Sequence, residues 1–115
     1  MKIRDFFKKW RTPKDSYKYD DIVVVSSNDD IPLGDLGKTI FLVQRDGTQR
    51  WLVLDCPGGH HKRIEVNLMR TMDPFWTLRI KDKKASLSPS VSVSDEKCDC
   101  HFWLRKNIAY KATFY

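Results

Sequence analysis

The sequence lacks the features that mark membrane-spanning and exported proteins. No apolar run approaches the ~20 residues that a membrane-spanning helix needs. The segment from Met1 to Lys9 is charged and has no apolar core of the kind found in signal peptides. We therefore expect a cytoplasmic protein with no membrane partner. In that compartment, Cys98-x-Cys100 indicates metal binding or reduced thiols before a disulfide.

Motifs for nucleic-acid recognition are also lacking, as are internal repeats and low-complexity segments. The formal net charge of +6 favours acidic partners. Basic and acidic residues nevertheless alternate along most of the chain, and only the N-terminal stretch is strongly basic. This pattern is typical of a soluble basic surface, and we expect no nucleic-acid partner.

The length of 115 residues predicts one domain with a modest core that needs no disulfides. Apolar residues in the N-terminal segment recur at helical spacing, so residues 1–13 are predicted to form a short amphipathic helix. Residues 14–21 are predicted to be a polar linker. Residues 22–115 are predicted to form the β domain that carries the cysteine and histidine loops.

The predicted domain is mostly β: a small, single antiparallel unit built as a meander of hairpins. Its clearest turn is Asp46-Gly47, because both residues tolerate the positive φ angles of tight hairpins. Further turns are indicated at 82–84 and 106–107. Strands are predicted at 22–26, 39–44, 50–55, 63–68, 75–80, 85–87, 101–105 and 108–112, with a loop over 28–37.

All three cysteines and all three histidines lie in two short stretches, 56–61 and 98–101. Zinc usually takes four such ligands, often two from each of two loops. The pattern predicts a structural zinc site, and its alternative is a set of buried thiols and solvated histidines. The candidate ligands are Cys56, His60, Cys98 and Cys100, with His61 and His101 as alternatives.

A different chemistry is indicated by Ser88-Pro89-Ser90. Pro89 fixes the backbone just before Ser90, and His101 begins a predicted strand that could lie beside it. A serine nucleophile needs such a base within hydrogen-bond reach. Serines at strand ends also cap and turn, which is the alternative for this stretch. A Cys100 thiolate paired with His101 is disfavoured, because adjacent strand residues point to opposite faces.

The order of these motifs resembles a family of short bacterial proteins long filed as a domain of unknown function. Its pattern runs Cys-Pro-x-Gly-Cys, Trp-x-Leu, Pro-Ser-Ile and Cys-x-Ser-His-Phe-Trp-Ile. The resemblance covers nearly the whole predicted β domain. The matching segments are Cys56-Pro57-Gly58-Gly59-His60, Trp76-Thr77-Leu78, Pro89-Ser90-Val91 and Cys98-x-Cys100-His101-Phe102-Trp103-Leu104.

The resemblance implies a role in a bacterial ubiquitin-like conjugation pathway, since members occur beside ubiquitin-like proteins and their activating and conjugating enzymes. It implies a serine peptidase that matures the ubiquitin-like protein or removes it from targets. Carried over by position, Ser90 would be the nucleophile and His101 the base. The ubiquitin-like protein, its conjugates and the enzymes of the pathway would be the partners.

This chain departs from the family pattern at three places. His60 stands where the family usually has cysteine, and histidine is also an acceptable zinc ligand. Cys100 stands where the family has serine. Lys62 stands where an acid often follows the first loop, which leaves Glu65 as the substitute for the orienting acid.

Two functions of different classes fit these residues. The first is a peptidase for a ubiquitin-like protein, with a narrow groove near Trp76 and Trp103 for an extended tail. The second is a non-catalytic zinc-stabilised β module that binds a component of the pathway. His101 separates the two, because it cannot be a zinc ligand and a general base together.

Overall fold

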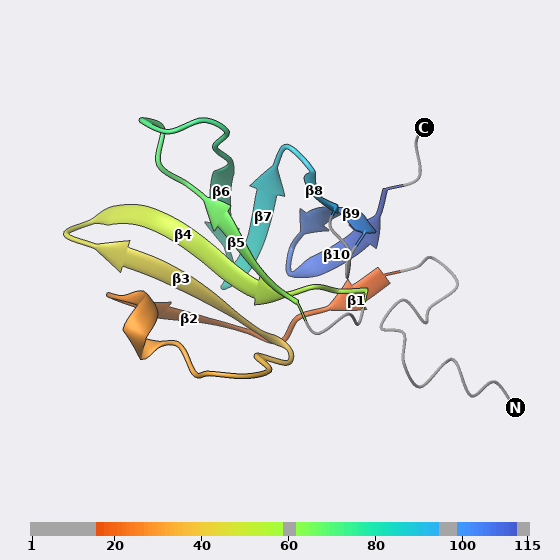
Figure 1. Ribbon diagram of the computed structural model, residues 1–115, viewed down its shortest axis with the longest axis horizontal. Coiled ribbons are helices and arrows are strands. Elements are labelled where there is room, and N and C mark those ends of the chain that lie inside the picture. Colours follow the sequence, from red (N-terminus) through yellow and green to blue (C-terminus); the bar gives the residue numbers. More distant parts are fainter. Residues whose placement is uncertain (1–15, 59–61, 95–98, 113–115) are drawn as a thin grey trace, which may run out of the picture.

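The computed structural model describes residues 16–58, 62–94 and 99–112, and most of them lie in strands (Figure 1). The described strands form a four-stranded sheet A, β1-β10-β9-β8, a four-stranded sheet B, β2-β3-β4-β5, and a two-stranded sheet C, β6-β7. A single short 3-10 helix, η2 (Asn28–Asp30), accompanies them in the described residues. The strands are β1 Ser16–Lys18, β2 Asp21–Val25, β3 Thr39–Arg45, β4 Thr48–Asp55, β5 Arg63–Asn67, β6 Thr77–Lys81, β7 Lys84–Ser88, β8 Val91–Ser94, β9 Asp99–Arg105 and β10 Ile108–Lys111.

The predicted mostly antiparallel β domain is confirmed, with one exception and one change of connectivity. Strands β2 and β3 pair in parallel, whereas every other pair in the described residues is antiparallel. The strands do not form one continuous meander, because β1 pairs with β10 near the other end of the chain. The predicted helix over residues 1–13 lies outside the described residues. Within them, no helix has the length and apolarity that crossing a membrane requires.

The prediction of a polar linker over 14–21 is wrong for its described part. Residues 16–18 form β1, and Tyr19 is fully buried. The amide of Tyr19 donates to the carbonyl of Asn107 at 2.8 Å, and its hydroxyl donates to the carbonyl of Asp55 at 2.6 Å. The backbone amide and the ring hydroxyl lie at opposite ends of this residue, with the apolar ring between them. Tyr19 can therefore join sheets A and B. The composition of this segment does not indicate the role of Tyr19, because the residues on both sides of it in the sequence are charged.

The main core lies where the three sheets meet. Strands β3 and β4 are buried on both faces, which explains their nearly continuous apolar sequence. Leu42 and Leu52 face the main core, while Phe41 and Val53 face a smaller cluster that the loop carrying Ile31 covers. The main core joins sheet B residues to side chains of sheets A and C, among them Ala85, Leu87, Val91, Phe102, Leu104 and Ala109.

The turn between β9 and β10 fastens sheet C to sheet A. Asn107 has a positive φ of 68° and is 2% exposed. Its side-chain oxygen accepts from the amide of Ala85 at 2.6 Å, and its own amide donates to the carbonyl of Ala85 at 2.8 Å. The predicted turn is therefore confirmed, and it also holds β7 beside β9.

Strand β8 was not predicted from the sequence. Its alternating serines were assigned to caps and turns. In the structure Val91 is buried in the main core and pairs with Phe102 of β9, while Ser92 is exposed. The alternation of valine and serine is that of a half-buried strand at the edge of the described part of sheet A.

Candidate active site

Ser90 and His101 lie in hydrogen-bond contact on the outer face of sheet A. The Ser90 Oγ and the His101 Nε2 are 2.8 Å apart. His101 pairs with Ser92 across β8 and β9, and Ser90 precedes Ser92 by two residues. Side chains two residues apart on an extended chain share a face, so this register brings the serine diagonally to the histidine. The contact joins positions eleven apart in the sequence.

The alternation along β9 separates His101 from the cysteine beside it. Cys100, Phe102 and Leu104 are buried in the main core, whereas His101 and Trp103 are only half-buried. Cys100 therefore points into the core and His101 points away from it, as the sequence predicted. His101 shares its face with Ser90, not with the thiol.

Trp76 holds the backbone of Ser90. Its indole Nε1 donates to the carbonyl of Ser90 at 3.1 Å. The sequence predicts a groove near Trp76 but not this hydrogen bond. No local pattern indicates the bond, because its partner is fourteen residues away. The loop before Trp76 is ordered by Asn67, whose side-chain amide donates to the carbonyls of Met69, Met72 and Pro74.

Glu65 does not come near this pair. It is exposed on β5 and lies opposite Val53 of β4, so both side chains belong to the outer face of sheet B. Val53 packs in the smaller cluster, on the side of the sheet away from the main core. His101 lies on the outer face of sheet A, so the main core stands between Glu65 and the histidine. The structure thus does not bring this predicted orienting acid to its base.

Two of the four predicted zinc ligands are described, and both belong to the same core. Cys56 and Cys100 are both buried in the main core. Burial raises the pKa of Tyr19 well above its usual value, and nearby Tyr17, Cys56 and Cys100 add to this shift. The Cys56 Sγ also accepts from the amide of Gly58 at 3.4 Å.

The other two predicted ligands, His60 and Cys98, lie outside the described residues, as does the alternative His61. Among the residues that the structure describes, no three His, Cys, Asp or Glu side chains gather as a metal site would require. The loop that carries the first pair is closed at its base, where the amide of Cys56 donates to the carbonyl of Lys62 at 2.8 Å. The donor set of two buried cysteines fits zinc, whose preferred ligands include thiolates.

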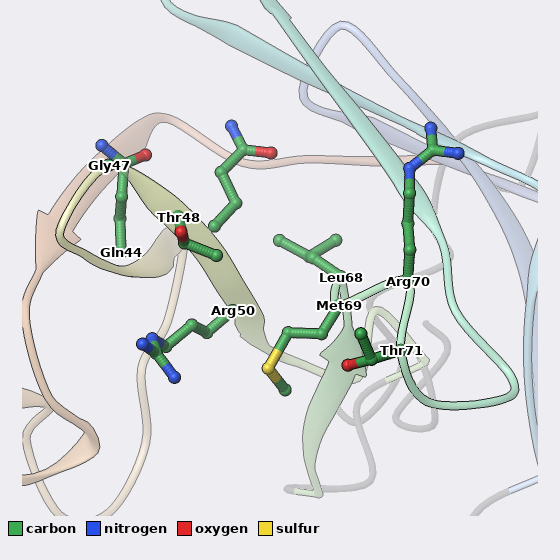
Figure 2. A pocket seen from close by; sticks show the side chains of 9 residues that line it. Gln44, Gly47, Thr48, Arg50, Leu68, Met69, Arg70 and Thr71 are labelled. Atoms are coloured by element: carbon green, nitrogen blue, oxygen red, sulfur yellow. The ribbon is translucent and has the colours of Figure 1, made fainter.

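A hollow of about 650 Å³ lies away from Ser90, between the turn of the β3–β4 hairpin and the segment after β5 (Figure 2). Arg50 and Met69 extend from the two sides of this hollow. The Arg50 Nε is buried and has no hydrogen-bond partner among the described residues. The hollow contains neither the serine nor the histidine of the pair, so the chemistry suggested by the sequence does not take place there.

Comparison with known families gives one match. A family model described as "Bacterial ubiquitination-like system serine protease (BubE)" matches residues 27–111. This range contains Ser90, His101 and every predicted zinc ligand. No curated protein and no solved structure gives a significant match to the chain.

Proposed function

We propose, because the chain belongs to the family of bacterial ubiquitination-like system serine proteases, that Ser90 and His101 carry out the hydrolysis. The observation that carries the proposal is the 2.8 Å contact between the Ser90 Oγ and the His101 Nε2. This is the reach a general base needs to take a hydroxyl proton. The substrate is a ubiquitin-like protein, cleaved from a C-terminal extension or from a target protein.

The proposed reaction uses these two side chains. Ser90 Oγ attacks the carbonyl carbon of the last residue of the ubiquitin-like protein, and its proton passes to His101 Nε2. The same nitrogen then gives the proton to the leaving amine, and the carbon–nitrogen bond breaks. Water then attacks the acyl-serine ester while His101 takes its proton. The histidine returns that proton to Ser90 Oγ as the carbon–oxygen bond breaks, which releases the carboxylate and restores the serine.

The substrate tail is proposed to bind in an extended form beside β8. This strand is at the edge of the described sheet A, and Ser90 comes directly before it. Extended peptides add readily to such edges through backbone hydrogen bonds. The half-buried rings of Trp76 and Trp103 flank the pair and favour a tail of small residues there.

Zinc is proposed to be structural. One ion would be held by Cys56, His60, Cys98 and Cys100, and it would stabilise the fold. Cys100 points into the core and His101 contacts Ser90. This supports separate roles, with the cysteine as a zinc ligand and the histidine as the base. A cytoplasmic location is proposed with it, because thiols stay reduced there.

The alternative, a non-catalytic zinc-stabilised module that binds a pathway component, is favoured only if the serine is inert. The test is labelling with a fluorophosphonate probe, followed by mass spectrometry of the labelled residue. We expect the label on Ser90, loss of label in Ser90→Ala and His101→Ala, and full label in Ser92→Ala. Ser92 is the matched control, since it is exposed and lies directly opposite His101. Labelling that survives in Ser90→Ala would exclude the proposed nucleophile.

Cleavage is tested with a ubiquitin-like protein fused to a C-terminal reporter. Loss of a serine nucleophile costs on the order of a million-fold in rate where nucleophile and base act as a unit. The Ser90→Ala protein should therefore leave the fusion intact while melting like the unaltered protein. A variant that cleaves normally would contradict the mechanism.

A further inference from the structure

A basic groove runs along the outer side of sheet C beside β9. One hollow of about 310 Å³ is lined by Arg79, Ser88 and Arg105, among others. A second of about 270 Å³ is lined by Lys81, Lys84 and Lys106. Both share Arg79 and Ser86, so they form one continuous depression. We call it the basic groove.

The strand register explains why these side chains share one surface. Ala85 and Leu87 of β7 point into the main core, so Ser86 and Ser88 point outward. Arg79 lies opposite Ser86, and Lys81 lies opposite Lys84, which places the cations on that outward side. The only acidic residue lining either hollow is Asp82, at the turn. The surface is therefore strongly positive.

The end of the groove nearest the active site is built and held in place. The Arg105 guanidinium donates to the carbonyl of Leu87 at 2.9 Å and stacks over the ring of Trp103, 4.8 Å from its centre. The amide of Lys106 donates to the Ser86 hydroxyl at 2.9 Å. The first two contacts fix the position of the Arg105 cation before any ligand arrives, and the third fixes the backbone of Lys106.

The groove lies near the Ser90–His101 pair, on the same face of β9. His101, Trp103 and Arg105 alternate along β9 and so share its outer face. The arginine lies four positions after the histidine along the strand, a span of roughly 14 Å at ~3.4 Å per residue. Ser88, which lines the groove, precedes the nucleophile by two residues. An extended polypeptide whose scissile bond lies at Ser90 would reach the groove about four residues away.

The positive charges in the groove repel one another and lower the stability of the fold unless an anion binds there. Lys81 and Lys84 lie directly opposite each other, and like charges in such pairs are destabilising. Within the described residues, no ion pair neutralises either lysine or the neighbouring Arg79. An acidic ligand would relieve this repulsion. A surface kept positive beside a catalytic pair is suited to attracting a negatively charged substrate.

We propose that the basic groove binds acidic side chains of the substrate polypeptide, placed about four residues from the scissile bond. This inference rests on the proposed function, because it assigns the occupant of the groove to the substrate cleaved at Ser90. The groove selects substrates by charge, and the serine and histidine perform the chemistry. A nucleic acid would meet the same cations, but the proximity to a peptidase pair favours a peptide.

The first test measures binding apart from cleavage. Fluorescein-labelled peptides of equal length, one acidic and one neutral, are titrated into Ser90→Ala protein and followed by anisotropy. We expect the acidic peptide to bind more tightly and to weaken as salt is raised. Reversing two groove charges, Arg79→Glu with Lys81→Glu, should reduce its affinity about ten-fold. Arg45→Glu is the matched control, because Arg45 is exposed at the far end of β3.

Three results would overturn the groove assignment: equal binding of both peptides, equal loss in the control, or tighter binding of a mixed-sequence oligonucleotide than of the acidic peptide. The second test labels Ser90 with fluorophosphonate in the double variant that retains its serine. Normal labelling together with a raised KM for acidic peptides supports the inference. If acidic peptides bind but Ser90 is not labelled even in the unaltered protein, the proposed function is overturned. The substrate role of the groove is then overturned with it.

Discussion

The indole Nε1 of Trp76 donates a 3.1 Å hydrogen bond to the carbonyl oxygen of Ser90. The two residues belong to different segments: Trp76 precedes β6, and Ser90 lies between β7 and β8. The indole thus connects the loop that Asn67 organises to the backbone that carries the proposed nucleophile. A side chain in this place positions the serine without touching the reacting atoms.

Replacing Trp76 with Phe should lower kcat more than it raises KM. The phenyl ring keeps most of the packing but cannot donate the hydrogen bond, which is worth about 1 kcal/mol. We expect a fall in kcat of about five- to ten-fold with a small change in melting temperature. Steady-state kinetics on the fusion substrate would measure both constants. Trp51→Phe serves as the control, since Trp51 packs in the smaller cluster; an equal fall there would argue against positioning.

The two members of the proposed catalytic pair should not contribute additively. If Ser90 and His101 act as a unit, removing both should cost about as much rate as removing either. The rates of Ser90→Ala, His101→Ala and the double variant, measured under one set of conditions, decide this. Independent losses that multiply in the double variant would separate the roles of the two side chains. Release of metal from His101→Ala would instead favour the non-catalytic zinc module.

Purified protein should contain one zinc ion per chain. Removing it with a chelator should lower the melting temperature, because metal binding by Cys56 and its proposed partners contributes directly to folding. Elemental analysis of protein prepared without added metal would give the stoichiometry. Cys98→Ser should lose the ion, whereas His61→Ala should keep it if His60 is the ligand. Metal well below one equivalent, with no effect of chelator, would refute the site.

Replacing Asn107 with Ala should destabilise the domain by about 2–4 kcal/mol. The change removes a buried acceptor from the amide of Ala85 and places a Cβ-bearing residue without side-chain support at a φ of 68°. Asn107→Gly is the matched comparison, because glycine tolerates that φ and loses only the hydrogen bond. Chemical denaturation should rank the alanine variant below the glycine variant. The opposite order would show that backbone conformation is not a significant part of the cost.

Deleting residues 1–12 should lower stability or solubility. The apolar residues Ile3, Phe6, Phe7 and Trp10 are predicted to be covered by the body of the domain or by a partner. Thermal melting and gel filtration of the truncated protein would measure the effect. A truncated protein that melts, elutes and cleaves like the full chain would show that the segment is dispensable.

The sequence by itself determined the β class and the hairpin turns, and it supplied the candidate residues for the chemistry. The turns at Asp46-Gly47 and Lys106-Asn107 could be predicted, because few residue types accept the positive φ angles of such turns. The direction of Cys100 away from His101 was readable because strand side chains alternate between faces. These are local rules, and they need no knowledge of distant residues.

Only the tertiary structure decided which distant residues meet. It brought Ser90 to His101 through the register of β8 and β9, a strand pair the sequence did not predict. It placed Glu65 across the main core from His101, and it drew Tyr19 out of a polar segment into the junction of sheets A and B. Register and sheet packing depend on burying apolar surface contributed by the whole chain. No short segment contains that information, so local patterns could name the chemical groups but not assemble them.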